Sequence, residues 1–147
     1  MKLLDDMVDF YKSFDLNKTI LEAVEENESV ILDLNANSQL FEEGITSRGI
    51  PIANFAPYSP VTVEIKKMKG QPTNRVTLYD EGDFYESMFI EYVPDGFIIR
   101  ASDWKTEALM VKYGSDILGL TEENIKYLAE EFIVPYVLNR LRYERKG

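Results

Sequence analysis

The sequence predicts an α+β fold in which helices pack against a small antiparallel sheet. Apolar residues recur at helical spacing through the N-terminal third of the chain. A β-hairpin pattern with a short turn lies at 88–101 and is expected at the centre of the sheet. A long helical pattern with a capping residue at its start then occupies 121–143. Together these three observations define the predicted class.

The length of the chain predicts one domain. It has 147 residues, of which 45% are hydrophobic and 29% charged, so a substantial core can form. We expect a single domain over 1–147. Its successive parts are a helical part at 1–43, an apolar loop or arm at 44–58, and an α+β part at 59–147.

Two helices are predicted in the first part. The first places four apolar residues on one face, namely Leu4, Met7, Tyr11 and Phe14. The second is predicted from about Thr19 to Glu43, with Asp15 or Asn17 as its cap and Gly44 as its stop. Its apolar stripe consists of Ile20, Val24, Ile31, Leu34 and Phe41.

The segment 44–58 combines turn residues with apolar side chains. Glycines and prolines interrupt it, so one regular element cannot span it. It nevertheless contains five sizeable apolar side chains: Ile45, Ile50, Ile52, Phe55 and Tyr58. Soluble monomers avoid exposing such a group together. We predict that this arm contacts another subunit; folding back onto its own domain is the alternative.

The segment 59–70 favours a short helix. Ser59 is a suitable N-cap, Pro60 suits the first helical position, and Gly70 ends the run. Val61, Ile65 and Met68 then share one helical face. A strand is the alternative, because β-branched residues also alternate between positions 61 and 65.

A short extended piece at 76–78 and one or two helical turns within 80–87 precede the hairpin. The hairpin is predicted from Met88 to Val93 and from Phe97 to Ala101, because Pro94-Asp95-Gly96 has the composition of a tight turn.

Two helices are predicted after the hairpin. The first runs over 106–113 and ends at Gly114. The last begins after Thr121, which can cap it, and acids occupy its first turn as the helix dipole favours. Pro135 lies inside this helix, so we expect a kink or division near Ile133.

The composition argues against catalysis and against metal binding. The chain has no histidine and no cysteine, which removes the commonest general base, the thiolate zinc ligands and any disulfide. The acidic stretch 80–83 lacks the spacing of a calcium loop. We therefore expect no catalytic residue, no metal ligand and no cofactor. A hydrolase using carboxylates alone is a remote alternative and would need bound Mg²⁺ or Ca²⁺.

The charge argues against binding to nucleic acids and membranes. With 16 basic and 26 acidic residues, the formal net charge is −10, which repels phosphates and anionic lipids. No apolar run is long enough for a membrane span, and acids at positions 5 and 6 exclude a signal peptide. We expect a cytoplasmic protein until assembly. The single tryptophan, Trp104, predicts either a core anchor or an interface anchor.

A resemblance to a known family rests on the order of short motifs between 59 and 124. These are Ser59-Pro60-x-Thr62, Lys66-Lys67-x-Lys69-Gly70, Val76-Thr77-Leu78-Tyr79-Asp80-Glu81-Gly82-Asp83-Phe84-x-x-Ser87, Lys112-Tyr113-Gly114 and Leu118-Gly119-Leu120-Thr121-Glu122-Glu123-Asn124. In this order the chain resembles the tail-completion, neck and head–tail connector proteins of tailed bacteriophages, and looks closest to those of Bacteroidetes phages. Glu81 departs from the family pattern, which usually has threonine there.

The resemblance implies a structural protein of the virion. It implies a homo-oligomeric ring below the portal, in contact with the portal and with other neck and tail proteins. DNA would pass through the ring without specific binding. The implied location is the virion, preceded by the bacterial host cytoplasm before assembly. The alternative is a small acidic cytosolic regulator or inhibitor, of the DNA-mimic or anti-defence type, that acts by binding other proteins.

Overall fold

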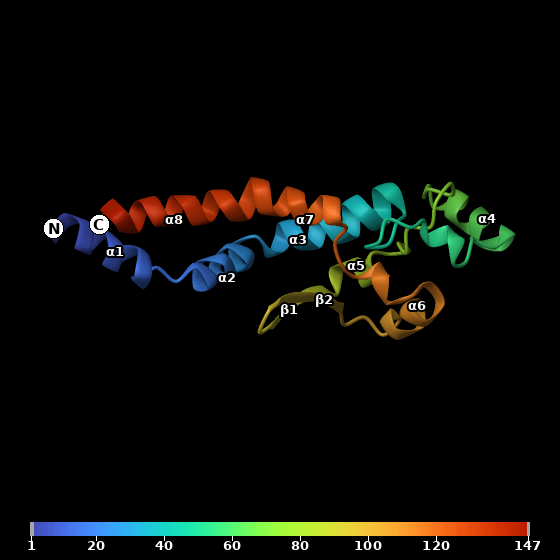
Figure 1. The fold of residues 1–147 in the computed structure, drawn as a ribbon. Coiled ribbons are helices and arrows are strands. Elements are labelled where there is room, and N and C mark those ends of the chain that lie inside the picture. The colour runs from blue at the N-terminus through green and yellow to red at the C-terminus, as the bar shows by residue number, and fades with distance from the viewer. Residues whose placement is uncertain (1, 147) are drawn as a thin grey trace. The chain divides into compact units, whose positions relative to one another are not determined.

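The computed structural model describes residues 2–146, and of residues 10–13 and 144–146 it describes the backbone alone. The fold is α+β, as predicted: helices accompany a two-stranded antiparallel hairpin, and a long helical region ends the chain (Figure 1). The described chain divides into two compact units. Unit 1 comprises the residues up to Glu28 and those from Lys126 onward, and unit 2 is Ser29–Ile125. The prediction of a single domain stays a prediction.

Unit 1 is helical. It contains α1 (Lys2–Ser13), α2 (Leu16–Glu26), the end of α7 (Glu122–Leu128), the π-type segment η4 (Ala129–Ile133) and α8 (Val134–Lys146). α2 lies alongside η4 and α8 (Figure 1). Asp15 caps α2, since its carboxylate accepts a hydrogen bond from the Lys18 N–H at 3.0 Å. Helix type changes at Ile133, where the sequence predicted an interruption by Pro135.

The predicted apolar face of α1 is exposed where it is described. Leu4 and Met7 are both exposed, and so are their neighbours Leu3 and Val8. Phe14 is half-buried. The side chain of Tyr11 lies outside the described residues. The predicted helix is confirmed as α1, but its described apolar side chains do not lie in the core.

The predicted single helix over 19–43 was wrong, because the structure has three segments there. α2 ends at Asn27, whose side-chain amide donates to the carbonyl of Ala23 at 2.8 Å. α3 (Glu28–Asp33) and the π-type segment η1 (Leu34–Glu43) follow. The predicted stop at Gly44 is confirmed. It has φ of 64°, and a Cβ there would lie 2.9 Å from Cβ of Arg75.

η1 holds the later chain through two buried amides. The side chain of Asn35 donates to the Ile117 carbonyl at 3.0 Å and accepts from the Gly119 N–H at 2.8 Å. Gln39 donates to the Gly119 carbonyl at 2.8 Å and accepts from the Thr121 N–H at 2.9 Å. Asn124 also donates to the Gln39 side-chain oxygen at 2.8 Å. We call this arrangement the amide clasp.

The helix predicted after Ser59 is confirmed as α4 (Pro60–Met68), and the strand alternative was wrong. The Ser59 hydroxyl accepts the Thr62 N–H at 3.2 Å, and Pro60 opens the helix. Between α4 and the hairpin lie an irregular segment and the single turn of α5 (Asp83–Glu86). The extended piece predicted at 76–78 is not a strand, since Leu78 has φ of 60°.

The hairpin consists of β1 (Met88–Val93) and β2 (Gly96–Ala101), joined by Pro94 and Asp95. Strand β2 begins one residue earlier than predicted. The register pairs Ile90 with Ile99 and Phe89 with Arg100. One face is therefore buried at the base of the hairpin, through Ile99, whereas Phe89 on the other face is exposed.

The final elements of unit 2 are α6 (Thr106–Tyr113), the short 3₁₀ turn η3 (Ser115–Ile117) and the start of α7. The predicted end of α6 at Gly114 and the predicted cap at Thr121 are both confirmed. The Thr121 hydroxyl accepts the Asn124 N–H at 3.1 Å. Because the amide clasp binds 117–124 to η1, α6 is fixed within unit 2 at its C-terminal end.

Candidate interaction surfaces

The predicted arm at 44–58 is folded against its own unit. Ile45 and Pro51 form an isolated antiparallel bridge, and the N–H of Ile52 donates to the Gly44 carbonyl at 2.9 Å. Ser47 adds a backbone hydrogen bond of 2.7 Å to the carbonyl of Asp116, from η3. The short 3₁₀ turn η2 (Ile52–Asn54) then reverses the chain. The segment is an ordered loop with its own hydrogen bonds.

The six predicted interface residues differ in exposure. Ile52 is fully buried in unit 2, so it has no surface for a partner. Ile45 and Tyr58 are half-buried, and the hydroxyl of Tyr58 accepts the N–H of Thr77 at 3.0 Å. The exposed members are Ile50, Phe55 and Trp104. The interface prediction therefore stays a prediction, with these three as its accessible residues.

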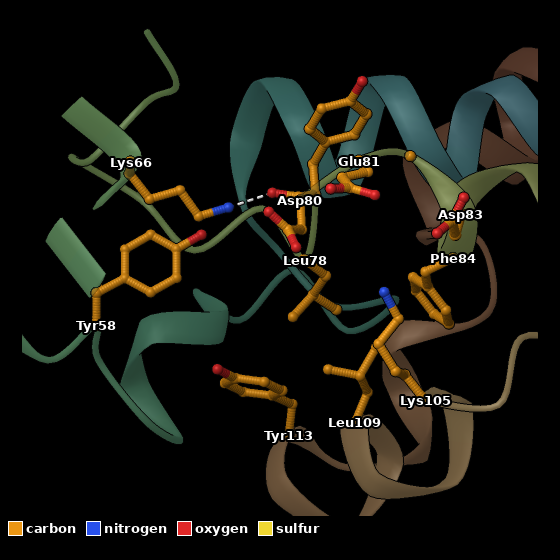
Figure 2. A pocket seen from close by; sticks show the side chains of 12 residues that line it. Tyr58, Lys66, Leu78, Asp80, Glu81, Asp83, Phe84, Lys105, Leu109 and Tyr113 are labelled. Carbon is orange, nitrogen blue, oxygen red and sulfur yellow. Dashed lines mark hydrogen bonds between the residues drawn. The ribbon is translucent and has the colours of Figure 1, made fainter. Parts of the chain in front are cut away.

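A pocket of about 190 Å³ separates the inner face of α4 from α6. Figure 2 shows Lys66 and Tyr58 approaching it from one side, and Leu109 and Tyr113 from another. Only 8% of Lys66 is exposed. Its ammonium donates to the carbonyl of Tyr79 and lies 5.4 Å from the ring centre of Tyr58. The lysine is thus held from both sides, and its stem lines the pocket.

Thr77 links three segments behind this pocket. Its N–H bonds to Tyr58, its carbonyl accepts the hydroxyl of Tyr85, and its own hydroxyl accepts the N–H of Tyr79 at 3.2 Å. Burial, followed by the proximity of Tyr58 and Tyr79, raises the pKa of Tyr85 well above its usual value. The N–H, carbonyl and hydroxyl of Thr77 are therefore all hydrogen-bonded, which suits a structural role for this residue.

Asp80, which lines the pocket, forms an exposed ion pair. The ammonium of Lys69 donates to the carboxylate of Asp80. This hydrogen bond raises the pKa of Lys69 above 10.5 and lowers the pKa of Asp80 below 3.8. The charges of Lys66 and Lys105 act on Asp80 in the same direction. Both groups therefore stay charged over the neutral range.

The outward face of α4 is apolar. Val61, Ile65 and Met68 are all exposed, and Met68 reaches 87%. An apolar helical stripe ordinarily faces the core, but here Lys66 takes the inward position. We call these three exposed residues the α4 ridge. Around it the stretch 60–69 carries three lysines and one glutamate, so its local charge is positive.

A second apolar surface runs from the residues before α6 along that helix. Trp104 is 86% exposed and Val111 83% exposed. They border an open depression of about 470 Å³, whose other lining residues include Met110, Asp103 and Glu107. Two acids and no cation line it. We call these five residues the α6 depression. The ammonium of nearby Lys105 lies 6.0 Å from the tryptophan ring.

The described part of the chain offers little for other kinds of site. Over residues 2–146 no group of three or more acidic side chains is placed to hold a metal ion. Within the same range, no helix has the length and apolarity needed to cross a bilayer.

No protein-family model matches this chain, and no curated protein or solved structure is significantly similar to it.

The sequence identified part of these surfaces. It singled out Trp104 as a possible interface anchor. The residues at the ends of α4, Ser59, Pro60 and Gly70, correctly predicted that helix. It did not predict that the stripe of α4 would face outward, because that depends on the carbonyl of Tyr79 and the ring of Tyr58 accepting Lys66. It also gave no role to Gln39, whose i, i+4 spacing from Asn35 was the available signal.

Proposed function

We propose that this chain is a structural subunit of a phage virion, forming part of the neck or head–tail connector ring through which DNA passes. The order of motifs between 59 and 124 supports this assignment to phage. All of those motifs lie within unit 2. The motif that leads into the last helix belongs to the amide clasp, so its side chains and backbone support the fold.

The observation that best supports an assembly role is the amount of exposed apolar surface. Among residues whose burial is described, the exposed large hydrophobic side chains outnumber the buried hydrophobic ones. On α1 and α4 these side chains are spaced three or four residues apart and so share one helix face. Soluble monomers rarely expose such contiguous apolar groups. A protein that buries these surfaces against neighbours removes that cost. The formal charge of −10 is also consistent with a channel wall, because an acidic wall repels the phosphates of DNA and would not retain it.

Sedimentation velocity over a dilution series tests the proposal, for the protein alone and after mixing with the portal protein of the same phage. We expect oligomers at multiples of the subunit mass, or a complex with the portal, and rings by electron microscopy. Duplex DNA should not be retained. The proposal is contradicted if the protein is a monomer or dimer at every concentration and does not bind the portal protein. That result favours the acidic inhibitor.

A further inference from the structure

We infer that Asp95-Gly96, at the tip of the hairpin, is a spontaneous modification site, at which the aspartate converts to isoaspartate without an enzyme. The inference goes beyond the proposed function and does not depend on it. It rests on the sequence of the turn, on its exposure and on the backbone conformation that closes it. Asp95-Gly96 is the only aspartate–glycine pair of the chain, which contains no asparagine–glycine pair.

The reaction needs only these two residues and water. The backbone nitrogen of Gly96 attacks the side-chain carboxyl carbon of Asp95 and forms a new C–N bond, which closes a succinimide ring. The amide proton and the hydroxyl of the protonated carboxyl group leave together as water. Because resonance delocalises the lone pair of a peptide nitrogen, this step is slow and depends on steric access.

Hydrolysis of the ring gives two products. Water adds to one of the two ring carbonyls and breaks its bond to the nitrogen. Opening at the side-chain carbonyl restores aspartate. Opening at the main-chain carbonyl leaves the peptide running through the side chain of Asp95, with a new free α-carboxylate, and this product is isoaspartate. One water is lost and one is regained, so the mass of the chain is unchanged.

The structure leaves both reacting groups accessible. Gly96 has no side chain, and a Cβ built there would have no neighbour within 4 Å. Pro94, Asp95 and Gly96 are all exposed. Within residues 2–146, neither a hydrogen bond nor an ion pair holds the carboxylate of Asp95. The carboxyl group can therefore rotate toward the nitrogen of Gly96, and water reaches both.

The backbone of the turn makes the tip of the hairpin easy to open. The register pairs Val93 with Gly96, so only Pro94 and Asp95 connect the strands. Two-residue turns that match the twist of a hairpin have a positive φ at one or both central residues. Neither Pro94 nor Asp95 has one, since among the described non-glycine residues a positive φ occurs at Leu78. Such a turn splays the strands, so the last pair opens at low cost and Asp95 reaches the reacting conformation.

Comparable bonds elsewhere in the described chain are held more firmly or are more crowded. Asn37 also precedes a small residue, Ser38, but lies inside the π-type segment η1, whose hydrogen bonds fix the backbone. Its side chain is bonded to that of Asp33. Asp116 precedes Ile117, whose branched side chain crowds the attacking nitrogen. We therefore expect no comparable reaction at these two positions.

Isomerisation should change the tip of the hairpin and leave its base intact. The Cβ of Asp95 enters the main chain, so the turn becomes longer and the pair of Val93 with Gly96 loses its register. At the base, Ile90 pairs with Ile99, which is only 4% exposed. The modified protein therefore stays folded, with a hairpin that is shortened from its tip.

Incubation of the folded full-length protein at physiological temperature and neutral pH tests the inference. Peptide mapping by mass spectrometry should show a second peptide containing Asp95 with unchanged mass, and a minor peptide lighter by one water. An isoaspartyl methyltransferase supplies an independent readout. It transfers the methyl group of S-adenosylmethionine to the new α-carboxylate as an ester and releases S-adenosylhomocysteine. We expect this transfer to increase with the time of incubation.

Two variants control for modification at other positions. Asp95→Glu keeps the charge and the exposure of the side chain but requires a larger ring, which closes far more slowly, so it should give no product. Asp95→Asn should react faster than the parent protein, because the neutral amide does not repel the attacking nitrogen as a carboxylate does. Equal methyl transfer to the parent protein and to Asp95→Glu would place the modification elsewhere and overturn the inference.

The same chain unfolded in urea gives the intrinsic rate of the sequence. We expect the folded protein to react within about tenfold of that rate, because the tip of the hairpin opens at low cost. If Asp95 reacts in urea but forms no isoaspartate in the folded protein, the hairpin protects the bond and the inference is wrong.

Discussion

The amide clasp and the α4 ridge belong to the same compact unit but reverse the usual pattern of burial. In the clasp, Asn35 and Gln39 are fully buried. In the ridge, Val61 and Met68 are exposed. The difference lies in their partners. Each buried amide finds both a donor and an acceptor on the segment 117–124, so its burial costs little. At these two places burial follows hydrogen-bond partners rather than residue type.

The largest expected effect is at the clasp. Gln39→Ala removes the partner of the Gly119 carbonyl, the Thr121 N–H and the Asn124 amide at once. We expect a loss of about 2–4 kcal/mol in the free energy of unfolding, measured by urea denaturation.

Asn37→Ala is the matched control for the clasp. It lies on the same segment, is exposed and bonds only to the side chain of Asp33, so it should cost less than about 1 kcal/mol. If the Gln39 and Asn37 variants lose similar amounts of unfolding free energy, the hydrogen bonds of the clasp do not stabilise the fold more than an exposed one does.

The next effect tests the orientation of α4 with two adjacent lysines. Lys66→Glu places a carboxylate next to the Tyr79 carbonyl in a buried position, so it should cost about 2–3 kcal/mol in unfolding free energy. Lys67→Glu makes the same change on the exposed side and should cost less than about 0.5 kcal/mol. Thermal and urea unfolding measure both. The reverse order would show that the apolar ridge faces inward.

The smallest effect is the pH dependence of the exposed pair. Because the pKa of Asp80 is lowered, its contribution to stability is complete above pH 3.8 and is lost as pH falls through the lowered value. Because the pKa of Lys69 is raised, its contribution is complete below pH 10.5 and is lost as pH rises through the raised value. Between these limits the contribution of this pair to stability should not change with pH.

Carboxyl NMR of Asp80 measures this directly. Lys69→Gln should move the Asp80 midpoint upward, toward 3.8, because the hydrogen bond from Lys69 is the largest cause of its shift. An unchanged midpoint in that variant would show that the pair is not formed in solution.

Local signals predicted most of the elements. Ser59, Thr121 and Gly44 each act through backbone groups three to five residues away, so the sequence alone identified these caps and stops. The turn at Pro94 and Asp95 is equally local, and the hairpin followed from it. Such features do not depend on the rest of the fold.

The errors of prediction involve contacts distant in sequence. The helix predicted over 19–43 divides at Asn27 and continues as a π-type segment. That segment presents Asn35 and Gln39 to partners eighty or more residues away. The loop containing Ile52 is held by Gly44 and Asp116. No periodicity in the sequence encodes these partners. The same is true of the α4 ridge. It faces outward because the ammonium of Lys66 contacts the Tyr79 carbonyl and the Tyr58 ring on the inner side of the helix.

Fluorescence of Trp104 tests the central claim most directly. It is the only tryptophan of the chain, lies in the α6 depression and is 86% exposed in the single subunit. Contact with a neighbouring subunit at this side chain would remove it from water. The emission should therefore shift to the blue as protein concentration rises, in step with the sedimenting oligomer. Emission that keeps the position of an exposed tryptophan while the protein is fully oligomeric would contradict the account.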